Sequence, residues 1–179
     1  MGDCGQLTCQ MWHVRESCMI GYYTMALYSG LQCAVVRNGI IYGAPAATFD
    51  VLQRVQNNLA RVVCQSRGRV DARPLLRSLH WLPVRQRVTH KMATTTFKVM
   101  SSSTPAYLSD LIETATPARP LRSSDAPLLA VPRVRTELAR RAFSVAAPQT
   151  WNSLPANIRQ CNYLPTFKRH LKTHLFTHS

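Results

Sequence analysis

The sequence predicts a mainly α-helical protein in which short helices are joined at prolines, with one small β-hairpin. Apolar residues recur at helical spacing over residues 48–65, 84–99 and 167–176. The chain contains eleven prolines, and proline begins or ends helices because it lacks an amide hydrogen and clashes with the preceding turn. Strand-like runs occur at residues 128–131 and 142–145, and these two runs predict the hairpin.

The first predicted helix, residues 48–65, begins with Thr48 as N-cap and carries Asp50 in its first turn, where a carboxylate interacts favourably with the helix dipole. Four apolar residues recur at helical spacing and are expected to face the core: Leu52, Val55, Leu59 and Val62. Arg54 and Arg61 lie seven residues apart and therefore share a different face of the helix.

Residues 79–84, Leu-His-Trp-Leu-Pro-Val, predict a buried corner between two helices. A short helix capped by Asp71 precedes the corner, and Pro83 begins the next helix. An indole ring needs cover from water, so the corner is expected to place three side chains in the core: Leu79, Trp81 and Leu82. His80 has no nucleophile or orienting carboxylate beside it in the sequence and is expected to be a packed core histidine.

The later helices are predicted by the same reasoning. The helix at 84–99 presents one face to the core, formed by Val84, Val88, Met92, Thr95 and Val99. Thr104 is the expected N-cap of a short helix that begins at Pro105. Trp151 is expected in the core, in a helical turn that Pro155 interrupts. The last helix presents Phe167, Leu171 and Leu175 on one side.

The charge of the chain is its most informative bulk property. The 179 residues carry a net charge of +14, while a hydrophobic content of 46% excludes a typical disordered composition. Asp3, Arg15, Glu16 and Arg37 cancel one another within residues 1–49, so all of the excess positive charge lies in the remainder of the chain. Such a field favours a polyanionic partner, namely nucleic acid or an anionic membrane surface.

The first 38 residues differ from the rest and are interpreted as a poorly ordered N-terminal arm. Four of the six cysteines lie there, yet Asp3 stands where a secretory signal would be basic. Residues 17–36 lack charge but contain too many polar side chains for a good membrane span. We therefore expect no membrane association, free thiols in a reducing compartment and an intracellular protein, with nucleus and cytoplasm both open.

Eight ordered segments from residue 42 onward form a recognisable pattern. They are Y-G-A-P (Tyr42–Pro45), L-Q-R-V-Q-N-N-L-A-R (Leu52–Arg61), L-H-W-L-P-V (Leu79–Val84), P-A-Y-L-S-D-L (Pro105–Leu111), L-R-S-S-D (Leu121–Asp125), V-P-R-V-R-T (Val131–Thr136), R-A-F-S-V-A-A-P-Q-T-W-N-S-L-P (Arg141–Pro155) and F-K-R-H-L-K-T-H-L-F (Phe167–Phe176). Together they resemble the C-terminal, post-palm region of reverse transcriptases from LINE-type, non-LTR retrotransposons of the jockey group. The likeness covers about residues 40–179, which divides the chain into the arm, 1–38, and a helical region, 39–179.

The resemblance implies an ancestor that copied RNA into DNA, but it transfers no catalytic residue. Polymerases of that family use adjacent carboxylates to hold two metal ions, and this chain has no two adjacent acidic residues. The family's endonuclease is absent as well. We therefore expect no enzymatic activity, no cofactor and no catalytic metal, and an inactive remnant of the enzyme.

Two sets of cysteines and histidines could suggest zinc. Cys161, His170, His174 and His178 lack an obvious second pair of closely spaced ligands. The other set, Cys4, Cys9, His13 and Cys18, matches a zinc knuckle in its last gap alone. We favour the interpretation that neither set binds a metal, with zinc binding as the alternative.

Basic side chains are the favoured functional residues, because guanidinium and ammonium groups bind phosphate. The predicted nucleic-acid-binding residues are Arg54, Arg61, Arg67, Arg69, Arg85, Arg87, Lys91, Arg133, Arg135, Arg140, Arg141, Lys168, Arg169 and Lys172. For any one of them taken alone, a solvated helix face is the favoured interpretation. The leading hypothesis is sequence-independent binding of RNA or DNA. The alternative is a structural fragment of the polymerase without independent function, which would associate with itself through exposed apolar faces.

Overall fold

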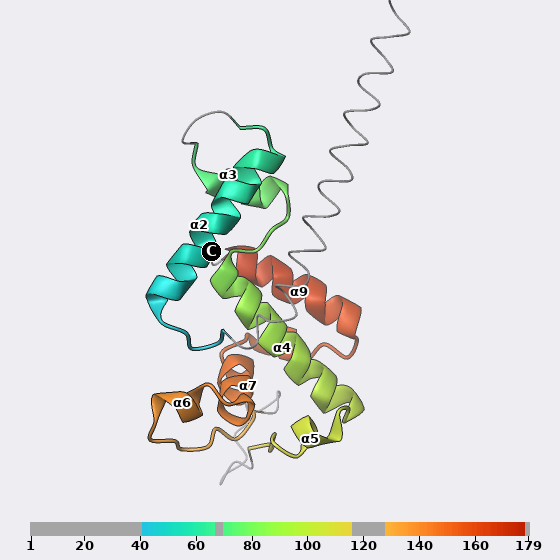
Figure 1. Cartoon of the computed structure of the whole chain (residues 1–179). Coiled ribbons are helices and arrows are strands. Elements are labelled where there is room, and N and C mark those ends of the chain that lie inside the picture. The colour runs from blue at the N-terminus through green and yellow to red at the C-terminus, as the bar shows by residue number, and fades with distance from the viewer. Residues whose placement is uncertain (1–40, 67–69, 116–127, 178–179) are drawn as a thin grey trace, which may run out of the picture.

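The computed structural model describes residues 41–66, 70–115 and 128–177, and this part of the chain is mainly α-helical (Figure 1). Its helices are α2 (Ala46–Val63), α3 (Ala72–Ser78), α4 (Val84–Ser102), α5 (Ala106–Ser109), α6 (Glu137–Arg140), α7 (Phe143–Asn152), α8 (Ala156–Arg159) and α9 (Leu164–Thr177). The predicted mainly α fold is confirmed. The arm assigned to residues 1–38 lies outside the described residues.

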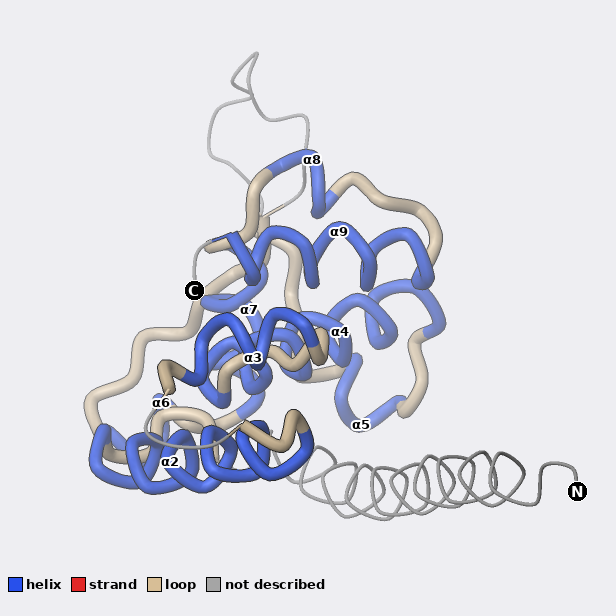
Figure 2. Tube along the Cα trace, turned by 90° about the horizontal axis from the view of Figure 1, so that it is seen from above, coloured by secondary structure: helices blue, strands red, loops and turns tan. Residues whose placement is uncertain are grey.

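The long helix α4 is the central element of the fold. It contacts α7 and α9 as well as α2, and α2 and α9 lie on opposite sides of it (Figures 1 and 2). The main core lies where α4, α7 and α9 meet. There Phe97, Trp151 and Phe167 contact one another, with ring centroids 4.5 Å apart for Phe97 and Phe167 and 5.8 Å apart for Trp151 and Phe167. Leu171 and Leu175 complete this core, as the spacing of the last helix predicts.

The predicted β-hairpin is wrong. Residues 142–145 lead into α7, and the run at 128–131 contributes an isolated antiparallel bridge between Leu129 and Thr114. Val145, Ala146 and Ala147 are all buried, a pattern that a one-sided strand cannot produce because its side chains alternate between two faces. The small alanines instead allow α7 to approach Met92 of α4 closely.

Helix α2 buries a different face from the one predicted. The expected core stripe is largely exposed, with Val55 52% and Val62 69% accessible, whereas Phe49, Gln56 and Ala60 are buried. Polar contacts to the corner select this face. Gln56 donates from Nε2 to the carbonyl oxygen of Leu82 at 2.8 Å, and Oε1 of Gln53 accepts from the amide of Val84. The helix also begins at Ala46, after Pro45, so Thr48 is not its N-cap.

The corner between α3 and α4 is present, but it is less buried than predicted. Leu82 is buried, whereas Leu79 and Trp81 are half-buried. His80 is exposed, with a positive φ of 55° and its Nδ1 3.0 Å from the carbonyl oxygen of Arg77, so the packed core histidine is wrong. The predicted cap is confirmed, since a carboxylate oxygen of Asp71 accepts a hydrogen bond from the amide of Arg73 at 3.1 Å.

Helix α4 buries the predicted face, except that one of its residues differs from the prediction. Val84, Val88, Met92 and Val99 are buried as expected, but Thr96 is buried in place of the half-buried Thr95. The Thr96 hydroxyl donates to the carbonyl oxygen of Met92 at 2.9 Å, which satisfies it within the helix. Thr104 does not cap α5; its hydroxyl donates to the carbonyl oxygen of Ser102 at 3.0 Å.

Candidate nucleic-acid interface

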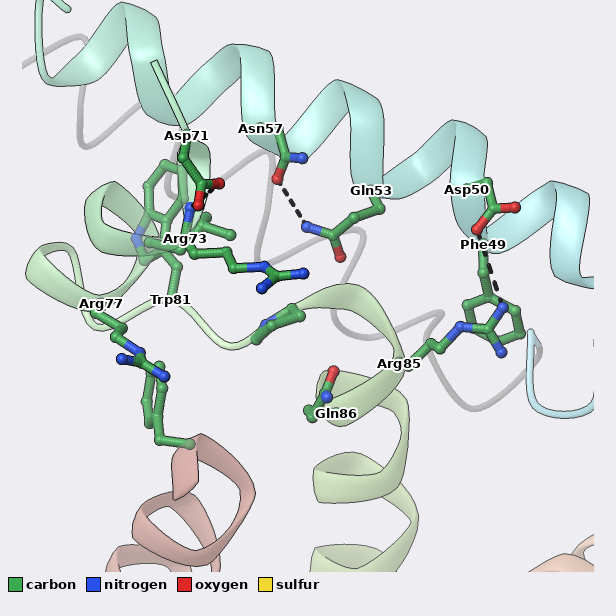
Figure 3. A pocket seen from close by; sticks show the side chains of 13 residues that line it. Phe49, Asp50, Gln53, Asn57, Asp71, Arg73, Arg77, Trp81, Arg85 and Gln86 are labelled. Atoms are coloured by element: carbon green, nitrogen blue, oxygen red, sulfur yellow. Dashed lines mark hydrogen bonds and ion pairs between the residues drawn. The ribbon is translucent and has the colours of Figure 1, made fainter. Parts of the chain in front are cut away.

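A cavity of about 510 Å³ lies between α2, α3, the start of α4 and the end of α9. Figure 3 shows side chains converging on it from these elements. The apolar part of its wall is formed by Phe49, Leu76, Trp81, Pro83 and Phe176, and the remainder is polar or charged. The half-buried indole of Trp81 therefore borders a polar hollow instead of standing within the core.

Amide side chains of α2 line the cavity near the start of α4. Gln53 accepts a hydrogen bond at Oε1 from the amide of Val84 at 2.9 Å and donates from Nε2 to Oδ1 of Asn57 at 2.8 Å. The first bond satisfies an amide at the N-terminus of α4 that has no partner within its own helix. Beside this hydrogen bond, Phe49 of α2 packs on Val84 and Val88 of α4, so the contact between the two helices is apolar on one side and polar on the side that faces the cavity.

Two arginines of α3 border the cavity four residues apart, and therefore on one side of that helix. Arg73 follows the Asp71 cap and its side chain extends across the hollow toward Gln53 (Figure 3). Arg77 lies one turn further along. Neither guanidinium has an acidic partner or a hydrogen bond within the described part of the chain. Both are available to an anion.

Arg85, at the start of α4, is held more firmly. Its guanidinium carbon lies 4.7 Å from the centroid of the Phe49 ring, and its Nη2 lies 4.0 Å from a carboxylate oxygen of Asp50. Both side chains are largely exposed, so solvent screens this ion pair and it contributes little to stability. Its effect is to place a third guanidinium at the edge of the cavity.

A group of lysines continues from the cavity between α4 and α9. Gln86 lines the cavity, and His90 lies one turn further along α4. Burial and the positive charges of Lys168, Lys172 and Lys91 together lower the pKa of His90 to about 4. The ammonium of Lys172 also lies 5.9 Å from the ring centroid of Phe176, a residue of the cavity wall. His90 is therefore neutral at pH 7, surrounded by three cations.

The lysines around His90 have no acidic partners among residues 41–66, 70–115 and 128–177. We call these lysines, together with the cavity residues Arg73, Arg77 and Arg85, the basic track; its members belong to α3, α4 and α9. Four of its members, Arg85, Lys91, Lys168 and Lys172, are predicted by the sequence.

The other predicted basic residues do not join the basic track. Arg54 is exposed on α2, where Arg61 donates to the carbonyl oxygen of Val70 at 3.1 Å. Arg87 donates to the carbonyl oxygen of Leu82 at 3.3 Å. Arg169 borders a separate hollow between α8 and α9. Arg67 and Arg69 lie outside the described residues.

The remaining four predicted arginines lie before, within and just after α6. Arg133 and Arg135 are exposed, and Arg140 is paired with Glu137 at 2.7 Å. Arg141 lies against Gly43, which has a φ of +70° and no room for a β-carbon beside the arginine side chain. Because α6 lies at the end of the molecule opposite α3 (Figure 1), these arginines form a second, separate basic region.

Sequence reasoning missed Arg73 and Arg77. Both sit in a segment that is notable for its leucines, and a pair of arginines at i and i+4 is common on solvated helix faces. The signal that could have identified them is their place in the short helix that Asp71 caps. That position fixes them on one side of a short helix beside the tryptophan corner.

Metal binding finds no support in the described residues. These contain no group of three or more histidine, cysteine or acidic side chains close enough to hold an ion. Cys161 is a half-buried free thiol, and its sulfur lies 3.6 Å from the carbonyl oxygen of Asn157. His178 and the set formed by Cys4, Cys9, His13 and Cys18 lie outside the described residues.

No protein-family model, curated protein or solved structure matches the chain. Within the described residues, no helix combines the length and apolar character needed to cross a membrane.

Proposed function

We propose that the chain is a catalytically inactive remnant of a non-LTR retrotransposon reverse transcriptase, and that its helical region binds RNA or DNA through backbone phosphates without reading sequence. The basic track carries this proposal, because it gathers six cations from three helices while only Arg85 forms an ion pair among the described residues. The eight ordered motifs support the ancestry, and the lack of adjacent carboxylates supports the loss of polymerase chemistry.

Unpaired cations that lie close together raise the free energy of the unbound protein. Three lysines close enough to lower the pKa of His90 repel one another in the free protein. A phosphate backbone relieves that repulsion and releases its own condensed counterions, which makes binding favourable and strongly dependent on salt. Contacts of this kind carry no sequence information.

The direct test is a titration of the full chain with RNA and with duplex DNA at several salt concentrations. We expect the logarithm of the binding constant to fall linearly with the logarithm of the salt concentration, with a slope of about −0.9 for each phosphate contacted on duplex DNA. Absence of binding at low salt, or binding that ignores salt, would refute the proposal.

A pair of matched variants assigns the binding to the basic track. Lys168→Gln removes an exposed charge of the track, whereas Lys98→Gln removes an exposed charge from α4 outside it. We expect the Lys168 variant to lower the salt slope by about one contact and the Lys98 variant to change it by less. Equal effects would show that net charge alone binds the nucleic acid.

The exposed apolar stripe of α2 supports a second candidate, a packing fragment of the polymerase without binding activity. Val51, Leu52, Val55 and Val62 are all exposed along this helix, and a contiguous apolar face of this kind marks a contact surface. Sedimentation at several protein concentrations tests it, because the stripe predicts self-association through α2. A compact monomer at every concentration would argue against this candidate.

A further inference from the structure

We infer that the cavity beside Trp81 receives one unpaired nucleotide of a single strand, with its phosphate at Arg73 and Arg77 and its base against the Trp81 indole. This inference rests on the proposed function and goes beyond it, since phosphate binding along the basic track requires no cavity. It assigns to the corner residues a role in distinguishing single strands from duplexes.

The size of the cavity limits the occupant. Its volume of about 510 Å³ falls within the range of roughly 300–1,000 Å³ that is typical of small-molecule sites. A nucleotide fits this space, but a base within a duplex cannot reach it, because its faces are stacked and its edge is paired. Proteins that bind single strands use aromatic side chains as stacking surfaces beside a basic groove, and Trp81 provides such a surface here.

The two guanidinium groups match a phosphate. Arg73 and Arg77 stand four residues apart on α3, and a guanidinium binds phosphate oxygens through two parallel hydrogen bonds. The cavity also contains two carboxylates, which oppose an anion. Asp71 uses one oxygen to cap α3 and Asp50 lies 4.0 Å from Arg85, so the two arginines of α3 keep their charge available.

The polar groups of the cavity predict tolerance of different bases. Gln53 uses both ends of its amide on Asn57 and Val84, which leaves Gln86 as an amide of the wall without a hydrogen bond among the described residues. One amide can rotate to donate or accept. It therefore satisfies the edge of any base without selecting one, in agreement with sequence-independent binding.

The experiment follows the fluorescence of Trp81 in the full chain. The variant Trp12→Phe leaves Trp81 and the buried Trp151 as emitters, and Trp12→Phe with Trp81→Phe leaves Trp151 alone. Each is titrated at low salt with a twelve-nucleotide oligouridylate, a duplex of twelve base pairs and polyglutamate of matched charge. We expect the oligouridylate to quench the first variant at least twice as strongly as the duplex, and the second variant not to respond.

Charge variants test the phosphate contact independently of the tryptophan. Arg73→Gln and Arg77→Gln are each expected to weaken oligouridylate binding about tenfold and duplex binding about twofold. Lys98→Gln removes the same charge and is expected to weaken both by the same factor, about twofold. Circular dichroism melting confirms that each variant is folded before it is titrated.

Three outcomes would overturn the inference. Equal quenching by single strand and duplex, or equal effects of Arg73→Gln and Lys98→Gln, would show that the cavity takes no base, while salt-dependent binding by the basic track would still stand. Quenching by polyglutamate as strong as that by oligouridylate would identify the cavity as a site for acidic peptides. Binding of no nucleic acid at all would refute the proposed function together with this inference.

Discussion

Two tryptophans mark two regions of the molecule with opposite character. Trp151 is 2% exposed and lies in the core, where its ring stacks on Phe167 and is tilted against Phe97. Trp81 is half-buried and borders a cavity whose walls carry three arginines. The same side chain serves stability where its surroundings are apolar, and it offers a binding surface where they are charged. The surroundings of each tryptophan at the two ends of α4, and not the residue type, decide between these roles.

Helix α4 joins the two regions and explains the difference between them. Its second half contacts the main core through Ala93 and Phe97, where α7 and α9 supply apolar partners. At its first turn, α2 meets it through the apolar contact of Phe49 with Val84 and Val88 and through a hydrogen bond to Gln53. The cavity borders this contact, where polar side chains of α2 and α3 line the space between the helices.

The largest expected effect contrasts the two tryptophans directly. Trp151→Ala removes a fully buried ring and is expected to lower the free energy of unfolding by about 3–5 kcal/mol. Trp81→Ala removes a half-buried ring beside a cavity and is expected to cost about 1–2 kcal/mol. Urea unfolding followed by circular dichroism measures both values. Equal losses would show that the corner belongs to the core, and the distinction between the two regions would fail.

The second prediction concerns His90, which lies on α4 between the two regions. Its folded-state pKa of about 4 lies below the usual 6.5, so the folded chain binds fewer protons than the unfolded chain between these pH values. Its contribution is therefore complete above about pH 6.5 and is lost as the pH falls toward 4. The full difference corresponds to at most roughly 3 kcal/mol.

Denaturant unfolding at half-unit steps of pH measures this contribution. His90→Gln is expected to flatten the stability profile between pH 6.5 and 4, because glutamine does not titrate. Lys172→Gln removes one of the charges that lower the pKa of His90 and is expected to flatten it partly. An unchanged profile in both variants would show that the lysines of the basic track do not surround His90 in solution.

Several local features of this fold are predicted correctly from local signals in the sequence, although Thr48 and Thr104 do not cap their helices. The Asp71 cap, the buried side of α9 and most of the buried side of α4 depend on residues within a few positions of one another. The buried face of α2 depends on hydrogen bonds to residues 26 and 31 positions away, and the apolar stripe of α2 indicates the wrong face for that reason. The cavity, and with it Arg73 and Arg77, depends on the same distant contacts.

The smallest expected effect tests that exposed stripe. Val55→Ala is expected to change stability by less than about 0.5 kcal/mol, because the side chain is 52% exposed and alanine is the better helix former. Val88→Ala makes the same change at a residue that is 3% exposed and is expected to cost about 2 kcal/mol. Both are measured by urea unfolding at two protein concentrations. If Val55→Ala costs as much as Val88→Ala, and its cost grows with protein concentration, then α2 is covered by another chain in solution. The packing-fragment candidate would then replace the basic track as the better account of this molecule.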